Sequence, residues 1–173
     1  MSPLTHAMRA AATTAAIGAV ACLGTATATA DPNDTLGNAI STKGYSPSNC
    51  SPQKPSEVQS AFPTVVAVMA CGQNSDSSGP ATAKYFLFPG SADLASAFTN
   101  LITSDTLTNC GDAKSPTTWH KTGANDSAGQ VACGTDSGKA EVIWTEDSKN
   151  VLAFVRASDG DTAALYKWWQ VNG

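Results

Sequence analysis

Positively charged side chains are scarce in this sequence. Its 173 residues include 10 Lys and Arg against 14 Asp and Glu, which gives a formal net charge of −4 at pH 7. No segment gathers lysine or arginine into a basic stripe. Such a chain cannot neutralise many phosphate groups, so nucleic acid and an anionic membrane surface are excluded from the expected partners.

Histidine is also rare, and the motifs of common catalytic and metal sites are missing. Only His6 and His120 occur, and no two cysteines stand at the C-x2-C spacing of many zinc sites. No G-x-S-x-G segment marks a hydrolase nucleophile. The acidic pairs Glu146/Asp147 and Asp159/Asp161 are expected to form a hairpin turn and a helix cap. We therefore expect no metal, no cofactor and no enzymatic activity.

Long hydrophobic runs are absent, and the most apolar stretch lies at the start of the chain. Arg9 is the only charged side chain before Asp31, and Ala28-Thr29-Ala30 places small residues at both positions that a signal peptidase reads. This order predicts a signal peptide over residues 1–30, no transmembrane span and a secreted protein, extracellular or in the cell wall. The alternative is a lipoprotein anchored through Cys22, which follows small residues.

Without the signal, four cysteines remain: Cys50, Cys71, Cys110 and Cys133. An even number in a small exported domain predicts two disulfides, and three pairings are possible. The two halves of the chain resemble each other, because Asn-Cys is followed by an Ala-Cys-Gly segment in each. This repeat favours one bridge in each half, Cys50–Cys71 and Cys110–Cys133.

The rest of the chain divides into a polar N-terminal segment, residues 31–49, and one domain, residues 50–173. Apolar or alternating runs predict five strands and two longer helices, and residues 104–125 are expected to be a loop. This order indicates an α+β fold, with an antiparallel sheet of about five strands, helices packed on one face and two disulfides. The strands are expected at 65–70, 82–88, 129–133, 139–145 and 150–156, and the helices at 91–102 and after Asp161.

Four tryptophans stand out in a chain with 7% aromatic residues: Trp119, Trp144, Trp168 and Trp169. Neighbouring helical residues point about 100° apart, so one of Trp168 and Trp169 is expected on the sheet and the other at its margin. Large aromatic side chains fill cores and also anchor interfaces. The four are therefore expected either in the core or on a ligand or partner surface.

Several short motifs recur in a characteristic order along the domain. They are Cys71-Gly72, Gly79-Pro80-Ala81-Thr82-Ala83, Ser115-Pro116 with Trp119, Gly129-Gln130-Val131-Ala132-Cys133-Gly134, Val142 with Trp144-Thr145, and Trp168-Trp169. This order resembles small secreted proteins of mycobacteria and their relatives. It is also similar to the extracytoplasmic domain attached to some mycobacterial serine/threonine protein kinases. The resemblance covers residues 50 to 173 and implies a free-standing, sensor-like binding module.

The leading hypothesis is a secreted, non-enzymatic module that binds an unknown small molecule, an envelope component or a protein. A monomer is expected. One alternative is a secreted hydrolase that uses His120. The other is a structural or interaction protein of the cell envelope.

Overall fold

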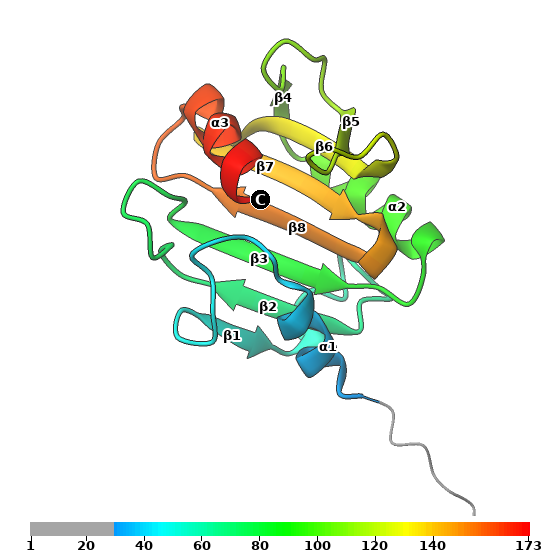
Figure 1. Cartoon of the computed structure of the whole chain (residues 1–173). Coiled ribbons are helices and arrows are strands. Elements are labelled where there is room, and N and C mark those ends of the chain that lie inside the picture. The colour runs from blue at the N-terminus through cyan, green and yellow to red at the C-terminus, as the bar shows by residue number, and fades with distance from the viewer. Residues whose placement is uncertain (1–29) are drawn as a thin grey trace, which may run out of the picture.

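Eight strands form one antiparallel sheet in the computed structural model, which describes residues 30–173 (Figure 1). The strand order is β1-β2-β3-β8-β7-β6-β4, and β5 pairs with the end of β6 that β4 does not reach. The predicted signal peptide and Cys22 fall outside the described part of the chain. The strands are β1 Cys50–Gln53, β2 Ala67–Cys71, β3 Thr82–Leu87, β4 Thr106–Thr108, β5 Thr117–His120, β6 Ser127–Asp136, β7 Lys139–Glu146 and β8 Val151–Arg156.

The prediction of about five strands is wrong, although the α+β class is confirmed. The five expected strands are present as β2, β3, β6, β7 and β8. The missed strands β1, β4 and β5 have three or four residues each, and their sequences are mostly polar. They lie along the outer sides of the sheet, where a strand needs no apolar pattern to form its hydrogen bonds. Two of them lie within residues 104–125, which were expected to be a loop.

Helices cover both faces of the sheet, so the prediction of helices on one face is also wrong. Helices α1 (Pro32–Ala39) and α3 (Thr162–Asn172) lie on one face, and α2 (Ser91–Ile102) lies behind the sheet (Figure 1). The reason is that the central strands are apolar on both sides. In β3, Tyr85 packs toward α1 and α3, while Phe86 packs toward α2. A strand buried on both sides requires a cover on each face.

The polar N-terminal segment places one apolar side chain in the core. Asp31 caps α1 by accepting a hydrogen bond from the Asn33 backbone N–H, at 2.8 Å. Leu36 is fully buried in the cluster that also contains Met69 of β2. Helix α1 therefore packs on the sheet within ten residues of the predicted processing site.

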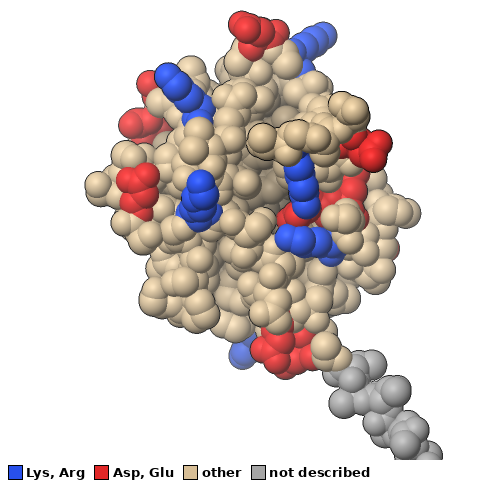
Figure 2. Space-filling view, viewed as in Figure 1, with Lys and Arg blue, Asp and Glu red and all other residues tan. Residues whose placement is uncertain are grey.

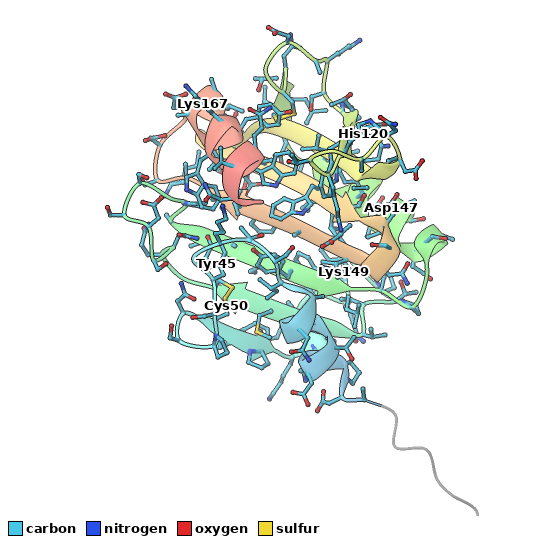
Figure 3. All side chains as sticks on the ribbon, in the orientation of Figure 1. Tyr45, Cys50, His120, Asp147, Lys149 and Lys167 are labelled. Carbon is cyan, nitrogen blue, oxygen red and sulfur yellow. A yellow bond between two sulfur atoms is a disulfide. The ribbon has the colours of Figure 1, made fainter. Side chains whose placement is uncertain are left out.

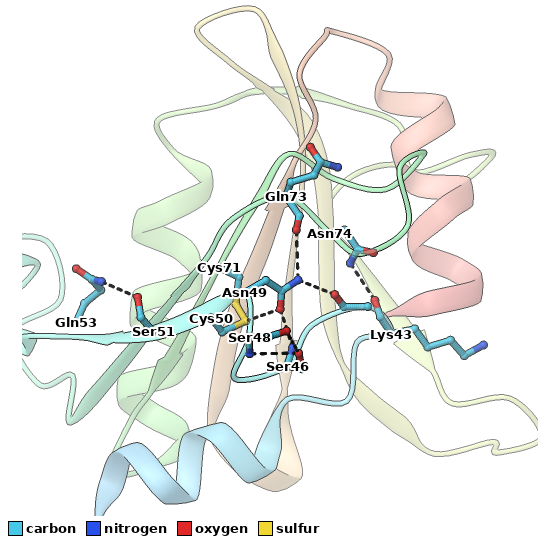
Figure 4. Close-up of a disulfide and its surroundings, with 11 residues drawn as sticks. Lys43, Ser46, Ser48, Asn49, Cys50, Ser51, Gln53, Cys71, Gln73 and Asn74 are labelled. Carbon is cyan, nitrogen blue, oxygen red and sulfur yellow. Dashed lines mark hydrogen bonds between the residues drawn. A yellow bond between two sulfur atoms is a disulfide. The ribbon is translucent and has the colours of Figure 1, made fainter.

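Both predicted disulfide pairings are confirmed, and each joins a strand on the outer side of the sheet to its neighbour. Cys50 of β1 is bonded to Cys71 of β2 (Figure 4). Cys110 follows β4 after one intervening residue, Asn109, and is bonded to Cys133 of β6. Two disulfides fit an oxidising, extracellular environment.

Hydrogen bonds near the first disulfide fix the loop that crosses the sheet between α1 and β1. The Asn49 side-chain amide donates to the Gly44 carbonyl at 2.8 Å and to the Gln73 carbonyl at 3.2 Å. Asn74, which is buried, donates to the Lys43 carbonyl at 2.9 Å (Figure 4). These contacts connect the 43–49 loop to the loop that follows β2, so the segment beside α3 is held in one conformation.

An ion-pair cluster lies where β6, β7 and β8 meet. Glu141 is 2% exposed and accepts a hydrogen bond from Arg156, which also pairs with Asp136. Burial raises the pKa of the Glu141 carboxyl to about 7, although the hydrogen bond from Arg156 opposes part of this rise. Burial also raises the pKa of nearby Asp105.

The raised pKa of Glu141 predicts how stability depends on pH. Because the folded-state pKa lies above the ordinary value of 4.5, this carboxyl contributes fully to stability below that pH and less as the pH rises through 7. Between pH 5 and pH 8, the free energy of unfolding of Glu141→Gln should therefore fall less than that of the wild type. Urea unfolding at several pH values measures both curves, and parallel curves would contradict the prediction.

Candidate functional site

Aromatic side chains form a continuous row across the face of the sheet that carries α1 and α3. The ring centroids of Tyr85 and Trp144 lie 6.1 Å apart, and those of Trp144 and Trp169 lie 5.7 Å apart. Trp119 meets Trp169 edge to face at 5.5 Å, and Tyr166 stacks on Trp169 at 5.7 Å. Three strands and one helix thus bring together rings that lie far apart in the sequence.

A cavity of about 600 Å³ opens at one end of this row, and we call it the tryptophan cleft. The lining comes from the chain after α1, from β5 and the segment after it, from β7 and the turn after it, and from α3 and the residue after it: Ser41, Thr118, Trp119, His120, Lys121, Thr122, Trp144, Glu146, Lys149, Tyr166, Trp169, Gln170 and Gly173. The same face is hollowed near its centre, with basic and acidic side chains beside the hollow (Figure 2). The volume of the tryptophan cleft lies in the range of small-molecule binding sites.

The tryptophans of the cleft have different roles. Trp169 is 5% exposed and Trp144 is 4% exposed, so both belong to the core and form the floor. Trp119 and Tyr166 are partly exposed and line the cleft. A ligand in the cleft can therefore reach the rings of Trp119 and Tyr166 most directly.

A backbone hydrogen bond holds the ring of Trp119 in place. Its indole N–H donates to the Thr145 carbonyl on β7, at 2.8 Å. Gly129 of β6 is the register partner of Trp119, and a Cβ built there would lie 2.1 Å from the same carbonyl oxygen. The glycine thus lets β5, β6 and β7 approach closely enough for this bond to form.

Glu146 is a buried carboxylate that two lysines share. Its side chain is 7% exposed, and its Oε1 atom lies 3.0 Å from Lys121 Nζ and 2.9 Å from Lys149 Nζ. Lys149 also donates to the Ala39 carbonyl at the end of α1, at 2.9 Å. Lys121 is 54% exposed and lines the cleft, so a ligand there can contact its side chain.

His120 lines the cleft, where it follows Trp119 at the end of β5 (Figure 3). Its Nδ1 atom lies 3.1 Å from the Asp126 backbone carbonyl, which is the one hydrogen bond of its ring among residues 30–173. A Ser-His-Asp triad requires the histidine to contact both a serine hydroxyl and a carboxylate. Neither contact is present among these residues.

Three of the four predicted tryptophans line the cleft, and Trp168 is not among the lining residues. As expected for neighbours on a helix, Trp169 packs on the sheet and Trp168 lies at its margin, where its indole N–H meets Asp76 at 3.4 Å. Sequence reasoning missed Lys121, Lys149 and Tyr166 and treated Glu146 as a turn residue. Lys149 meets Glu146 within the short turn that follows β7, whereas Lys121 reaches Glu146 through the pairing of β5 with β6, and Tyr166 comes from α3.

The residues that the structure describes offer no group of three or more His, Cys, Asp or Glu placed to hold a metal ion. Within that same part of the chain, none of the helices is both long and apolar enough to cross a membrane. Comparison of the chain with protein-family models, with curated proteins and with solved structures finds no match.

Proposed function

We propose that this protein is a secreted, non-enzymatic binding module whose ligand occupies the tryptophan cleft. The supporting observation is that partly exposed aromatic rings and a carboxylate shared by two lysines converge on one cavity of about 600 Å³. Ligand sites typically combine aromatic walls with a few convergent polar groups. The resemblance to extracytoplasmic kinase domains and small secreted mycobacterial proteins supports the same proposal.

The polar groups of the cleft support binding rather than catalysis. The imidazole of His120 meets a backbone carbonyl, and the carboxylate of Glu146 pairs with two ammonium groups. Two ion pairs through Oε1 hold the Glu146 carboxylate in place, so we assign it a role in positioning a ligand.

A thermal-shift screen tests this proposal with three classes of probe, namely oligosaccharides, lipids and peptides. A ligand that binds only the folded protein increases the free energy of unfolding, by about 2.7 kcal/mol when its concentration is a hundred times its Kd. The melting temperature of the protein rises as a result. At least one class should raise the melting temperature of the wild type. The same probe should have little effect on Trp119→Ala.

The matched control is Trp168→Ala, which removes an indole outside the cleft lining. This variant should respond to the probe as the wild type does. The proposal fails if a well-folded sample responds to no class, or if the two variants lose the response equally.

A further inference from the structure

We infer that the ligand of the tryptophan cleft is a saccharide, with a sugar ring stacked on Trp119 and hydroxyl groups at Lys121 and Glu146. This inference rests on the proposed function and names the chemistry of the ligand. The groups that line the cleft fit a saccharide better than the other main kinds of ligand that an extracellular domain meets.

The ring of Trp119 forms a preorganised platform at the cleft. Its indole N–H is bound to the Thr145 carbonyl, and its ring meets the ring of Trp169 edge to face. The ring therefore loses little conformational freedom when a ligand binds. The face of an aromatic ring carries partial negative charge, which attracts the polarised C–H bonds on the face of a sugar ring. A flat, fixed indole is thus complementary to a pyranose or furanose.

The polar lining of the cleft matches hydroxyl groups. Ser41, Thr118 and Thr122 contribute hydroxyls, and Gln170 contributes an amide. Lys121 can donate and Glu146 can accept hydrogen bonds at neighbouring positions, because their charged atoms lie 3.0 Å apart. Both ion pairs of Glu146 use Oε1, which leaves Oε2 as an acceptor for a ligand hydroxyl.

Other ligand classes fit these groups less well. A hydrocarbon chain would cover the hydroxyl, amide and carboxylate groups without hydrogen-bonding to them, which opposes binding. Aromatic sites also attract organic cations, but the ammonium groups of Lys121 and Lys149 would repel a cation here. A nucleic acid is disfavoured by the net charge of −4.

The test uses an array of neutral oligosaccharides of four to eight residues, built from glucose, mannose, galactose and arabinose, together with uronic-acid oligomers. Vesicles of phosphatidylglycerol and a mixed peptide library are the comparison probes. Saturable binding to at least one oligosaccharide is expected, with a change in intrinsic tryptophan fluorescence. Trp119→Ala should weaken this binding at least about 10-fold, as is typical for an aromatic anchor.

Lys121→Met provides a second variant, since an exposed lysine can be replaced without loss of the fold. It should also weaken oligosaccharide binding about 10-fold, while Trp168→Ala should stay within about 2-fold of the wild type. Binding to vesicles or peptides alone would overturn the saccharide assignment but leave the proposed binding function. Binding to no probe at all would overturn both. Oligosaccharide binding unchanged in Trp119→Ala would overturn the assignment to this cleft.

Discussion

Replacing Gly129 with alanine should lower the free energy of unfolding by about 2–5 kcal/mol, because backbone strain and overpacking act together. Gly129 has a φ of +157°, which side-chain-bearing residues rarely adopt. The new Cβ would lie 2.1 Å from the Thr145 carbonyl oxygen and 2.5 Å from its hydroxyl oxygen. Neither oxygen can retreat easily, since Thr145 is buried within β7.

The same substitution should disturb the cleft, because the Thr145 carbonyl anchors Trp119. Gly129→Ala is therefore expected to red-shift tryptophan fluorescence and to weaken ligand binding along with stability. Gly72→Ala is the matched control, since its nearest neighbour would be 4.0 Å away, an ordinary contact. Guanidinium unfolding measures both variants, and a loss below about 1 kcal/mol for Gly129→Ala would contradict the close approach described above.

Removing the Cys110–Cys133 disulfide is expected to have an effect of similar size. The double variant Cys110→Ala/Cys133→Ala should lose about 3–5 kcal/mol, because the bridge closes a loop of 23 residues and both sulfur atoms are buried. Cys110 lies between β4 and β5. Without the disulfide, the segment that leads into β5 and Trp119 is no longer covalently bound to β6. Tryptophan fluorescence should then change under native conditions, before the protein unfolds.

The other bridge serves as the control for that local effect. Cys50→Ala/Cys71→Ala should lose about 3 kcal/mol, since its loop of 21 residues has nearly the same length. The Cys50–Cys71 bridge joins β1 and β2, at the opposite edge of the sheet from β5. Its removal should therefore leave the native fluorescence of Trp119 unchanged. Equal fluorescence changes in both double variants would contradict the link between Cys110 and the cleft.

The sequence predicted the parts of this fold that depend on local patterns. Apolar runs indicated β2, β3 and β8, and amphipathic spacing indicated α2. The repeated cysteine segments indicated both disulfides. The layer arrangement was predicted wrongly because unbroken apolar strands were not taken to require helices on both faces.

The residues that meet in the tryptophan cleft could not be predicted from the sequence, because their contacts depend on strand pairing. Lys121 and Glu146 are 25 residues apart and meet only because β5 pairs with β6, a strand whose own partner is β7. Strand β5 has four mostly polar residues, which carry no periodic signal. Tryptophan could be recognised as notable from composition, but its neighbours depend on pairing that no local pattern encodes.

The outer strands also determine whether the sheets of two protein molecules can pair edge to edge. Strand β1 has four residues and contains Pro52, which has no N–H to donate to another chain. On the far side, β4 and β5 share the edge of β6, and the segment that holds Cys110 separates them. Neither border offers a long, regular row of backbone groups, so growth of the sheet by strand exchange or fibril formation is disfavoured at both borders.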